Sequence, residues 1–278
     1  MRAYHTQNGT ILEFEGTFYT SDLSWNELSR SENPRQLALE SIDHSAPAPN
    51  PLDQPQSLLP PIGKQEVWAS GVTYMRSRSA RMEEAKEAGG GTFYDRVYEA
   101  SRPELFFKAP YYRVSGHGGN VRIRRDSGWD VPEPELTLLL SPTGRITGYT
   151  IGNDMSSRSI EGENPLYLPQ AKTYDGAAAL GPCLYLPDGA LPVETEIRIA
   201  IRRADQLVFE GSTDLGQIRR GFDELASWLF RELTFPEGCL LMTGTGVVPP
   251  NAFTLQAGDE IRITIPPIGT LVNTVAAD

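Results

Sequence analysis

The sequence predicts an α+β fold that is rich in β-strands, with a small N-terminal α+β domain ahead of a larger domain. From Leu105 almost to the last residues, short apolar runs alternate with Gly or Pro turns, which is typical of successive strands. Only residues 221–233 interrupt this series as a convincing helix. A proline-rich stretch separates the series from a shorter segment at the N-terminus.

The leading segment, residues 1 to about 45, combines short strands with one small helix. Its alternating run NGTILEFEGTFYTSDLSW turns at Asn8-Gly9. The following stretch SAPAPNPLDQPQSLLPPIG contains six prolines, which exclude a regular helix and favour an extended chain. We therefore expect a small domain with its linker over residues 1–62 and a larger domain over 63–278.

Two further segments favour helices at the start of the larger domain. A strand over residues 66–74 leads into residues 75–89, which have good helix formers and end in a run of glycines. Residues 92–100 are expected to form a second helix. The strand series then follows.

Composition narrows the classes of function. The 278 residues carry a formal net charge of −11, which works against nucleic acid as a partner because phosphate binding needs a surplus of Lys and Arg. The sequence shows neither an export signal at its start nor an apolar stretch of membrane-spanning length. Cys183 and Cys239 are too few for a disulfide framework. We expect a cytoplasmic protein that binds neither nucleic acid nor a membrane.

Three carboxylates are the most informative feature. Glu133 and Glu135 lie two residues apart at the start of an expected strand, so alternation places both on one face. An isolated pair of this kind is usually two solvated acids. The next strand, however, returns after the turn at residues 141–144 and ends in Asp154, which would lie beside the pair. Three such carboxylates without a nearby His or Cys indicate a divalent ion that prefers oxygen ligands, namely Mg²⁺, Mn²⁺ or Ca²⁺.

The order of several motifs resembles the fumarylacetoacetate hydrolase family over roughly residues 65–278. The resemblance implies that family's mixed β-roll, with an ion held in an open cleft by Glu133, Glu135 and Asp154. It also suggests a homodimer or a homotetramer. The matching motifs are Pro103 to Lys108, Glu133-Pro134-Glu135-Leu136, Gly148 to Arg158, Lys172, Leu180-Gly181-Pro182 and Thr243-Gly244-Thr245-Gly246.

One departure from the family bears on the reaction. Its hydrolases carry an N-Y-x-x-H element whose His activates water, but this chain has Thr73-Tyr74-Met75-Arg76-Ser77 there. The three histidines of the chain, His5, His44 and His117, lie elsewhere in the sequence. The stretch SRSIEGENPLYLPQAKTYDGAAALGP resembles instead a subgroup that dehydrates 2-keto-3-deoxy sugar acids.

The resemblance to this subgroup implies roles for further residues. Glu104 and Lys172 are expected to transfer protons, although either could be the base. Without the resemblance, Glu104 would be read as a partner of Lys108, and Lys172 as a surface lysine. The residues expected to contact substrate are Tyr74, Arg76, Arg158, Gln170 and Thr245. The arginines at 76, 78 and 81 could also form a lid over an anionic substrate.

The expected reaction is the Mg²⁺-dependent dehydration of a 2-keto-3-deoxy-pentonate, of arabinonate or xylonate type, to 2,5-dioxopentanoate. A hydrolase or decarboxylase acting on an acylpyruvate or an oxaloacetate-like acid is the alternative within the family. A silent metal-binding protein on the same scaffold is an alternative of another class. No nucleotide cofactor is expected, because the turn at residues 243–246 lacks the spacing of a phosphate-binding loop.

Overall fold

The structure is a computed structural model, in which residues 1–42, 44–74 and 97–277 are described. The helix expected over residues 75–89 and most of the one expected over 92–100 lie outside the described residues, as do the arginines at 76, 78 and 81. None of the described helices is long and apolar enough to cross a membrane.

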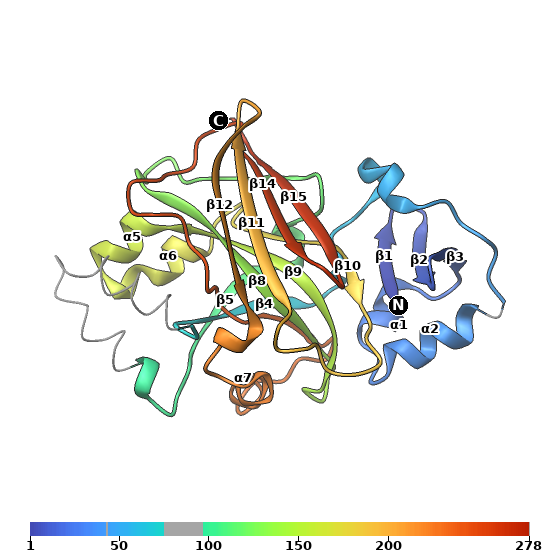
Figure 1. Ribbon diagram of the computed structural model, residues 1–278. Helices are drawn as coiled ribbons and strands as arrows, with labels where there is room; N and C mark the ends of the chain where they lie inside the picture. The colour runs from blue at the N-terminus through green and yellow to red at the C-terminus, as the bar shows by residue number, and fades with distance from the viewer. Residues whose placement is uncertain (43, 75–96, 278) are drawn as a thin grey trace.

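The larger of the two sheets in the described chain has ten strands and passes through the middle of the molecule (Figure 1). Nine strands form the main path of this sheet, and a tenth, β6 (Val114–Ser115), pairs with β10 (Ala178–Tyr185). The order along that path is β3 (Thr17–Ser21), β2 (Gly9–Phe14), β1 (Arg2–Thr6), β10 (Ala178–Tyr185), β9 (Ile146–Ser157), β8 (Asp130–Leu140), β13 (Cys239–Met242), β4 (Glu66–Gly71) and β5 (Glu104–Pro110).

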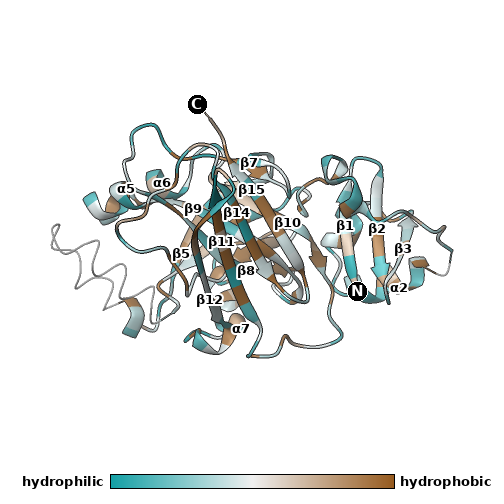
Figure 2. Ribbon diagram, turned by 45° about the horizontal axis from the view of Figure 1, so that its top comes forward, coloured by the Kyte–Doolittle hydropathy of each residue, from teal (hydrophilic) through white to brown (hydrophobic). Residues whose placement is uncertain are grey.

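A second sheet of five strands packs against one face of the first and closes the hydrophobic core. Alternate residues of β8, such as Leu136 and Leu138, meet Ile199 and Ile263 of the second sheet there. Figure 2 shows hydrophobic residues in brown on inner strands such as β10. The second sheet has the order β12 (Gln206–Asp214), β11 (Glu196–Arg203), β14 (Glu260–Ile265), β15 (Gly269–Val275) and β7 (Asn120–Val121). The α+β, strand-rich fold class expected from the sequence is thus confirmed.

The N-terminal strands lie to one side of the molecule, in blue in Figure 1. They nevertheless continue the large sheet, because Arg2 and Ala3 of β1 pair antiparallel with Tyr185 and Leu184 of β10. Backbone hydrogen bonds therefore join the N-terminal module to the larger domain across the boundary that the sequence predicts at residue 62.

The helices differ from the sequence expectations at three places. The N-terminal module has two helices, not one, and Ser24 and Glu27 form a capping box at the first. Two short helices replace expected strand after β9, where the Ser157 side chain accepts a hydrogen bond from the Ile160 N–H and so starts a helix. The helix expected over 221–233 ends at Leu229. The α-helices that lie wholly within the described residues are α1 (Trp25–Ser29), α2 (Pro34–Ile42), α5 (Arg158–Glu163), α6 (Leu168–Lys172) and α7 (Phe222–Leu229), and the 3₁₀ turns there are η1 (Pro51–Asp53), η2 (Pro55–Ser57), η3 (Tyr111–Arg113), η4 (Pro165–Tyr167) and η5 (Leu215–Gln217).

The early end of α7 has a packing cause. The ring of Phe230, just after the helix, packs on that of Phe235 with centroids 4.8 Å apart, so the chain has to turn back within five residues. A helix continuing to residue 233 would carry Phe235 away from this contact.

The hairpin β8–β9 is the element that builds the site. Its turn is closed by the Gly144 N–H, which donates to the Ser141 carbonyl over 2.9 Å, and Gly144 has a φ of 83°, which favours glycine. In the resulting register Glu133 lies directly opposite Asp154. The hairpin expected from the sequence is therefore present, with the acids on its buried face.

Asp130, at the start of β8, gives a prediction about stability. Burial raises the pKa of its carboxyl to about 6, so the folded protein holds this proton more tightly than the unfolded chain does. The free energy of unfolding contributed by this group therefore falls as the pH rises from about 4 to about 6. Asp130→Asn should remove that fall, on the order of 2 kcal/mol. Urea unfolding from pH 4 to 7 in EDTA would measure it, and parallel curves for the two proteins would contradict it.

Candidate active site

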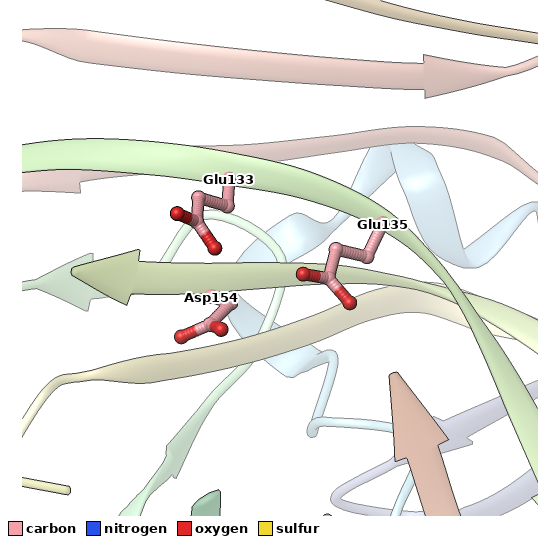
Figure 3. Close-up of side chains that lie close together, drawn as sticks. All are labelled: Glu133, Glu135 and Asp154. Atoms are coloured by element: carbon pink, nitrogen blue, oxygen red, sulfur yellow. The ribbon is translucent and has the colours of Figure 1, made fainter. Parts of the chain in front are cut away.

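Three buried carboxylates form the centre of the candidate site (Figure 3). Glu133 and Glu135 extend from β8 and Asp154 from β9, and one oxygen of each lies within 4.8 Å of the others. Their exposed fractions are 5%, 1% and 1%. Such close burial of like charges is unfavourable unless a cation or a proton offsets it.

The electrostatics of Glu135 illustrate this cost. Burial, followed by the charges of Asp154 and Glu133, raises the pKa of its carboxyl well above the usual range. The Gly244 N–H donates to its Oε2 over 2.6 Å, which opposes the rise and fixes the orientation of the carboxylate. The three acids, without a His or Cys ligand among the residues that line the described cavity, fit a hard divalent ion such as Mg²⁺.

Lys172 brings a positive charge to the same cavity from the end of α6. Its Nζ lies 2.7 Å from Glu133 Oε2 and 3.0 Å from Asp154 Oδ2, and it donates to the Ser156 hydroxyl over 2.6 Å. The side chain is fully buried, so Lys172 is not the surface lysine that the sequence would suggest without the family resemblance. Lys172, which the resemblance implies in proton transfer, thus contacts two members of the carboxylate cluster.

Lys108, on β5, is a residue whose role the sequence analysis missed. It is completely buried and forms an ion pair with Asp154, not with Glu104. Its Nζ also donates to the carbonyls of Met155, over 2.9 Å, and Lys172, over 2.6 Å. Burial lowers the pKa of this ammonium, although the charge of Asp154 opposes that effect. Because three acceptors surround Nζ and Lys108 does not line the cavity, it supports the carboxylate cluster from the side away from the cavity. The sequence feature that could have indicated this role is a lysine inside the apolar run Leu105 to Ala109.

Arg158 lines the cavity at the start of α5. Its Nη2 lies 2.6 Å from Glu133 Oε1, so this guanidinium supports a member of the carboxylate cluster. Only 3% of the side chain is exposed. A charged contact of this kind orients the carboxylate as well as neutralising it.

Glu104, at the start of β5, lies opposite Gly71 of β4 and lines a second pocket, not the cavity of the three carboxylates. A Cβ added to Gly71 would lie 2.2 Å from Glu104 Oε2, and Gly71 itself lines the cavity. The carboxylate therefore occupies space that only glycine leaves open.

Gly71→Ala should consequently displace the Glu104 carboxylate while leaving the metal-ligand candidates untouched. We expect turnover to fall by about tenfold or more, because a displaced proton-transfer group loses its geometry, while the affinity for Mg²⁺ stays the same. Steady-state kinetics together with titration calorimetry of Mg²⁺ would measure both. Unchanged turnover would contradict a role for Glu104 at this position.

Thr245 lines the cavity in the glycine turn after β13. Its hydroxyl donates to the Val247 carbonyl over 3.0 Å. The turn approaches β4 and the residues after it closely, since a Cβ on Gly244 would lie 2.9 Å from the Ser70 carbonyl oxygen and 2.0 Å from Thr73 Oγ1. At this position the Gly244 N–H donates to Glu135 Oε2, so a backbone amide of the turn holds a carboxylate of the protein itself.

The remaining expected contacts lie farther out. Tyr74 is 1% exposed, and its ring packs against Gly246: a Cβ added to Gly246 would lie 2.4 Å from the nearest ring carbon. Gln170 is exposed, and it is not among the described residues that line the cavity. Arg76 lies outside the described residues. Phe106 forms a cavity wall that the sequence analysis did not identify; Lys172 Nζ lies 5.6 Å from the centre of its ring.

Comparison with known proteins agrees with this arrangement. Residues 67–276 match the family described as fumarylacetoacetate (FAA) hydrolase C-terminal. A protein of Haloferax volcanii, named probable 2-keto-3-deoxyxylonate dehydratase, is 48% identical over 216 residues, covering 77% of this chain and 73% of that protein. The 2-dehydro-3-deoxy-D-arabinonate dehydratase of Saccharolobus solfataricus is 43% identical over 217 residues, with the same two coverages.

A solved structure is similar over almost the whole chain. It is 2-keto-3-deoxy-D-arabinonate dehydratase complexed with magnesium and 2,5-dioxopentanoate, with 33% sequence identity and a TM-score of 0.85. The superposition covers 99% of this chain and 98% of that one. The fold implied by the sequence resemblance is confirmed by this similarity.

Proposed function

Because this chain belongs to the fumarylacetoacetate hydrolase family, we propose that it is a Mg²⁺-dependent lyase that dehydrates a 2-keto-3-deoxy-pentonate to 2,5-dioxopentanoate. The observation that carries the proposal is the full-length similarity to the magnesium and 2,5-dioxopentanoate complex. The buried acids agree with it, because their chemistry suits a divalent ion.

The metal ligands in this proposal are Glu133, Glu135 and Asp154. A bound divalent ion supplies Lewis acidity toward the 2-oxo acid end of the substrate. Lys108 and Arg158 hold two of the three carboxylates in place from outside the cluster. The protein thus enters the reaction with its metal ligands already oriented.

Lys172 and Glu104 are the proposed proton-transfer groups. One removes a C3 proton, and the other delivers a proton to the C4 hydroxyl as the C4–O bond breaks and water leaves. Loss of a C5 proton and tautomerisation then give the C5 aldehyde. Lys172 is completely buried and lines the cavity, whereas Glu104 is half-buried and reaches the site through its contact with Gly71, which lines the cavity. Arg158 and Thr245 line the cavity and are proposed to contact the substrate, with Tyr74, Arg76 and Gln170 proposed around them.

The alternative of a hydrolase or decarboxylase is less well supported. His5 stacks on Trp25 in the N-terminal module, with ring centroids 4.5 Å apart. His117 lies beside Gly181 and Leu271, and neither it nor His44 lines the described cavity. Because these are all the histidines of the chain, a histidine that activates water is not available at this site.

A product assay tests the proposal. Purified protein would be given 2-keto-3-deoxy-pentonates with Mg²⁺ or with EDTA, and 2,5-dioxopentanoate would be followed through a coupled semialdehyde dehydrogenase. We expect product only with metal, and different rates for the epimers. Absence of product together with cleavage of acylpyruvates or oxaloacetate would overturn the dehydratase proposal in favour of the hydrolase branch.

Assembly and location form a separate part of the proposal. We propose a homodimer or homotetramer, because the family resemblance suggests one, and a location in the cytoplasm, because the similar proteins are named as dehydratases of small sugar acids. Light scattering after size-exclusion chromatography would measure the mass of the assembly, and a mass near 30.6 kDa would contradict it.

A further inference from the structure

A fourth buried carboxylate lies beside the three proposed ligands but is not one of them. Glu161 of α5 is 2% exposed, like the members of the triad. Its Oε1 lies 3.3 Å from Lys172 Nζ and its Oε2 lies 3.9 Å from Arg158 Nε. It does not line the cavity, so it contacts the two cations from behind.

Three cations offset these acids. Lys108 and Lys172 are fully buried and Arg158 is 3% exposed, and each contacts at least one member of the triad. Among the described residues, the buried charged groups at this site are therefore four carboxylates and three cations. With all of them ionised, their formal charge is −1.

This excess negative charge has a consequence for the substrate. A divalent ion changes the total to +1, and a monoanionic 2-keto acid then brings it to zero. A dianionic 2-keto acid would bring it to −1 and leave one buried negative charge without an opposite charge. Glu104 and Arg76, which are both proposed at this site, carry opposite charges, so counting both as ionised leaves each of these totals unchanged.

We propose that Glu161 makes this site selective for monoanionic 2-keto acids and against dicarboxylic ones. It does so through Lys172 and Arg158, whose charge it neutralises, so that neither is available to a second carboxylate. This inference rests on the proposed function, because it assigns the substrate class at the same site. The substrate of the proposed reaction, a sugar acid with hydroxyl groups and one carboxylate, fits this charge.

Glu161→Gln tests the proposal because it keeps the shape of the side chain and removes one negative charge. The total with a divalent ion becomes +2, which a dianion neutralises and a monoanion does not. Two unreactive probes of equal length, 2-oxopentanoate and 2-oxoglutarate, share the 2-oxo acid end and differ by one terminal carboxylate. Their dissociation constants would be measured by titration calorimetry at one saturating concentration of free Mg²⁺.

The readout is the ratio of the two dissociation constants, which a partial loss of folded protein does not change. Wild-type protein should bind 2-oxopentanoate more tightly, and Glu161→Gln should shift the ratio toward 2-oxoglutarate by about tenfold or more. Glu163→Gln, the same change at an exposed position of α5, should leave the ratio as it is. Glu161→Asp keeps the charge and should largely keep the wild-type ratio.

The outcomes separate this inference from the proposed function. An unchanged ratio in Glu161→Gln, with product formation intact in the wild type, overturns the role of Glu161 alone. If Glu161→Gln does not fold, equal or tighter binding of 2-oxoglutarate by the wild type still overturns it, and tighter binding of 2-oxopentanoate by both the wild type and Glu161→Asp supports it. If neither probe binds the wild type in Mg²⁺, the proposed function and the selectivity both fail.

Discussion

Glu135→Ala is expected to abolish metal-dependent turnover while leaving the fold intact. The substitution removes one of three carboxylates that together offer ligands within 4.8 Å, so the affinity for Mg²⁺ should fall by at least about a hundredfold. It also removes a carboxyl whose pKa is raised by burial and by its neighbours Asp154 and Glu133. Unfolding in EDTA should therefore show a metal-free variant at least as stable as the wild type.

Calorimetry with Mg²⁺, the coupled product assay and thermal unfolding in EDTA measure the three effects of Glu135→Ala. Glu210→Ala is the matched control, because Glu210 is an exposed glutamate on β12 in the second sheet. The control should retain wild-type metal affinity and turnover. Equal activity of the wild type with and without chelator would refute the metal site itself.

Lys172→Met should give the second large effect, with a different signature. Loss of a proton-transfer group is expected to lower kcat by about 10²–10⁴-fold. Metal affinity should not fall, because the variant loses a cation that lies 2.7 Å from Glu133 and 3.0 Å from Asp154. Without this competing charge, the carboxylates attract a divalent ion at least as strongly as before.

Kinetics at saturating Mg²⁺ and calorimetry of the ion distinguish this role of Lys172 from a merely structural one. A structural lysine would lower stability and metal affinity together, whereas the proposed role separates kcat from metal binding. Lys64→Met, a change at an exposed lysine, provides the control. Near-normal kcat in a folded Lys172→Met protein would refute proton transfer by this residue.

Local sequence patterns predicted the hairpin that carries the candidate site. Alternation in β8 and the turn at Gly144 predicted that Glu133, Glu135 and Asp154 would meet, and the register confirms that Glu133 faces Asp154. Such patterns are sufficient here because strand alternation and turn geometry depend on residues close together in the chain.

The helices after β9 were missed for a related reason. Ser157 starts α5 and Asn164 starts the 3₁₀ turn η4 by accepting a backbone hydrogen bond, but segments of three to six residues have too few apolar positions to show a helical period. Packing places them beside the sheet, where Lys172 at the end of α6 enters the cavity.

By itself, the sequence determined the strand-rich fold class, the carboxylate hairpin and, through its motifs, the resemblance to a family. Only the tertiary structure decided which charges share the cavity. Lys108 is 46 residues from Asp154, and Gly244 is 109 residues from Glu135, yet each contacts its partner directly. Contacts of this kind depend on how distant strands pair in the sheet, which no local period of the sequence specifies. The pairing of Glu161 with two buried cations, on which the proposed selectivity depends, likewise emerges only when α5 and α6 pack together.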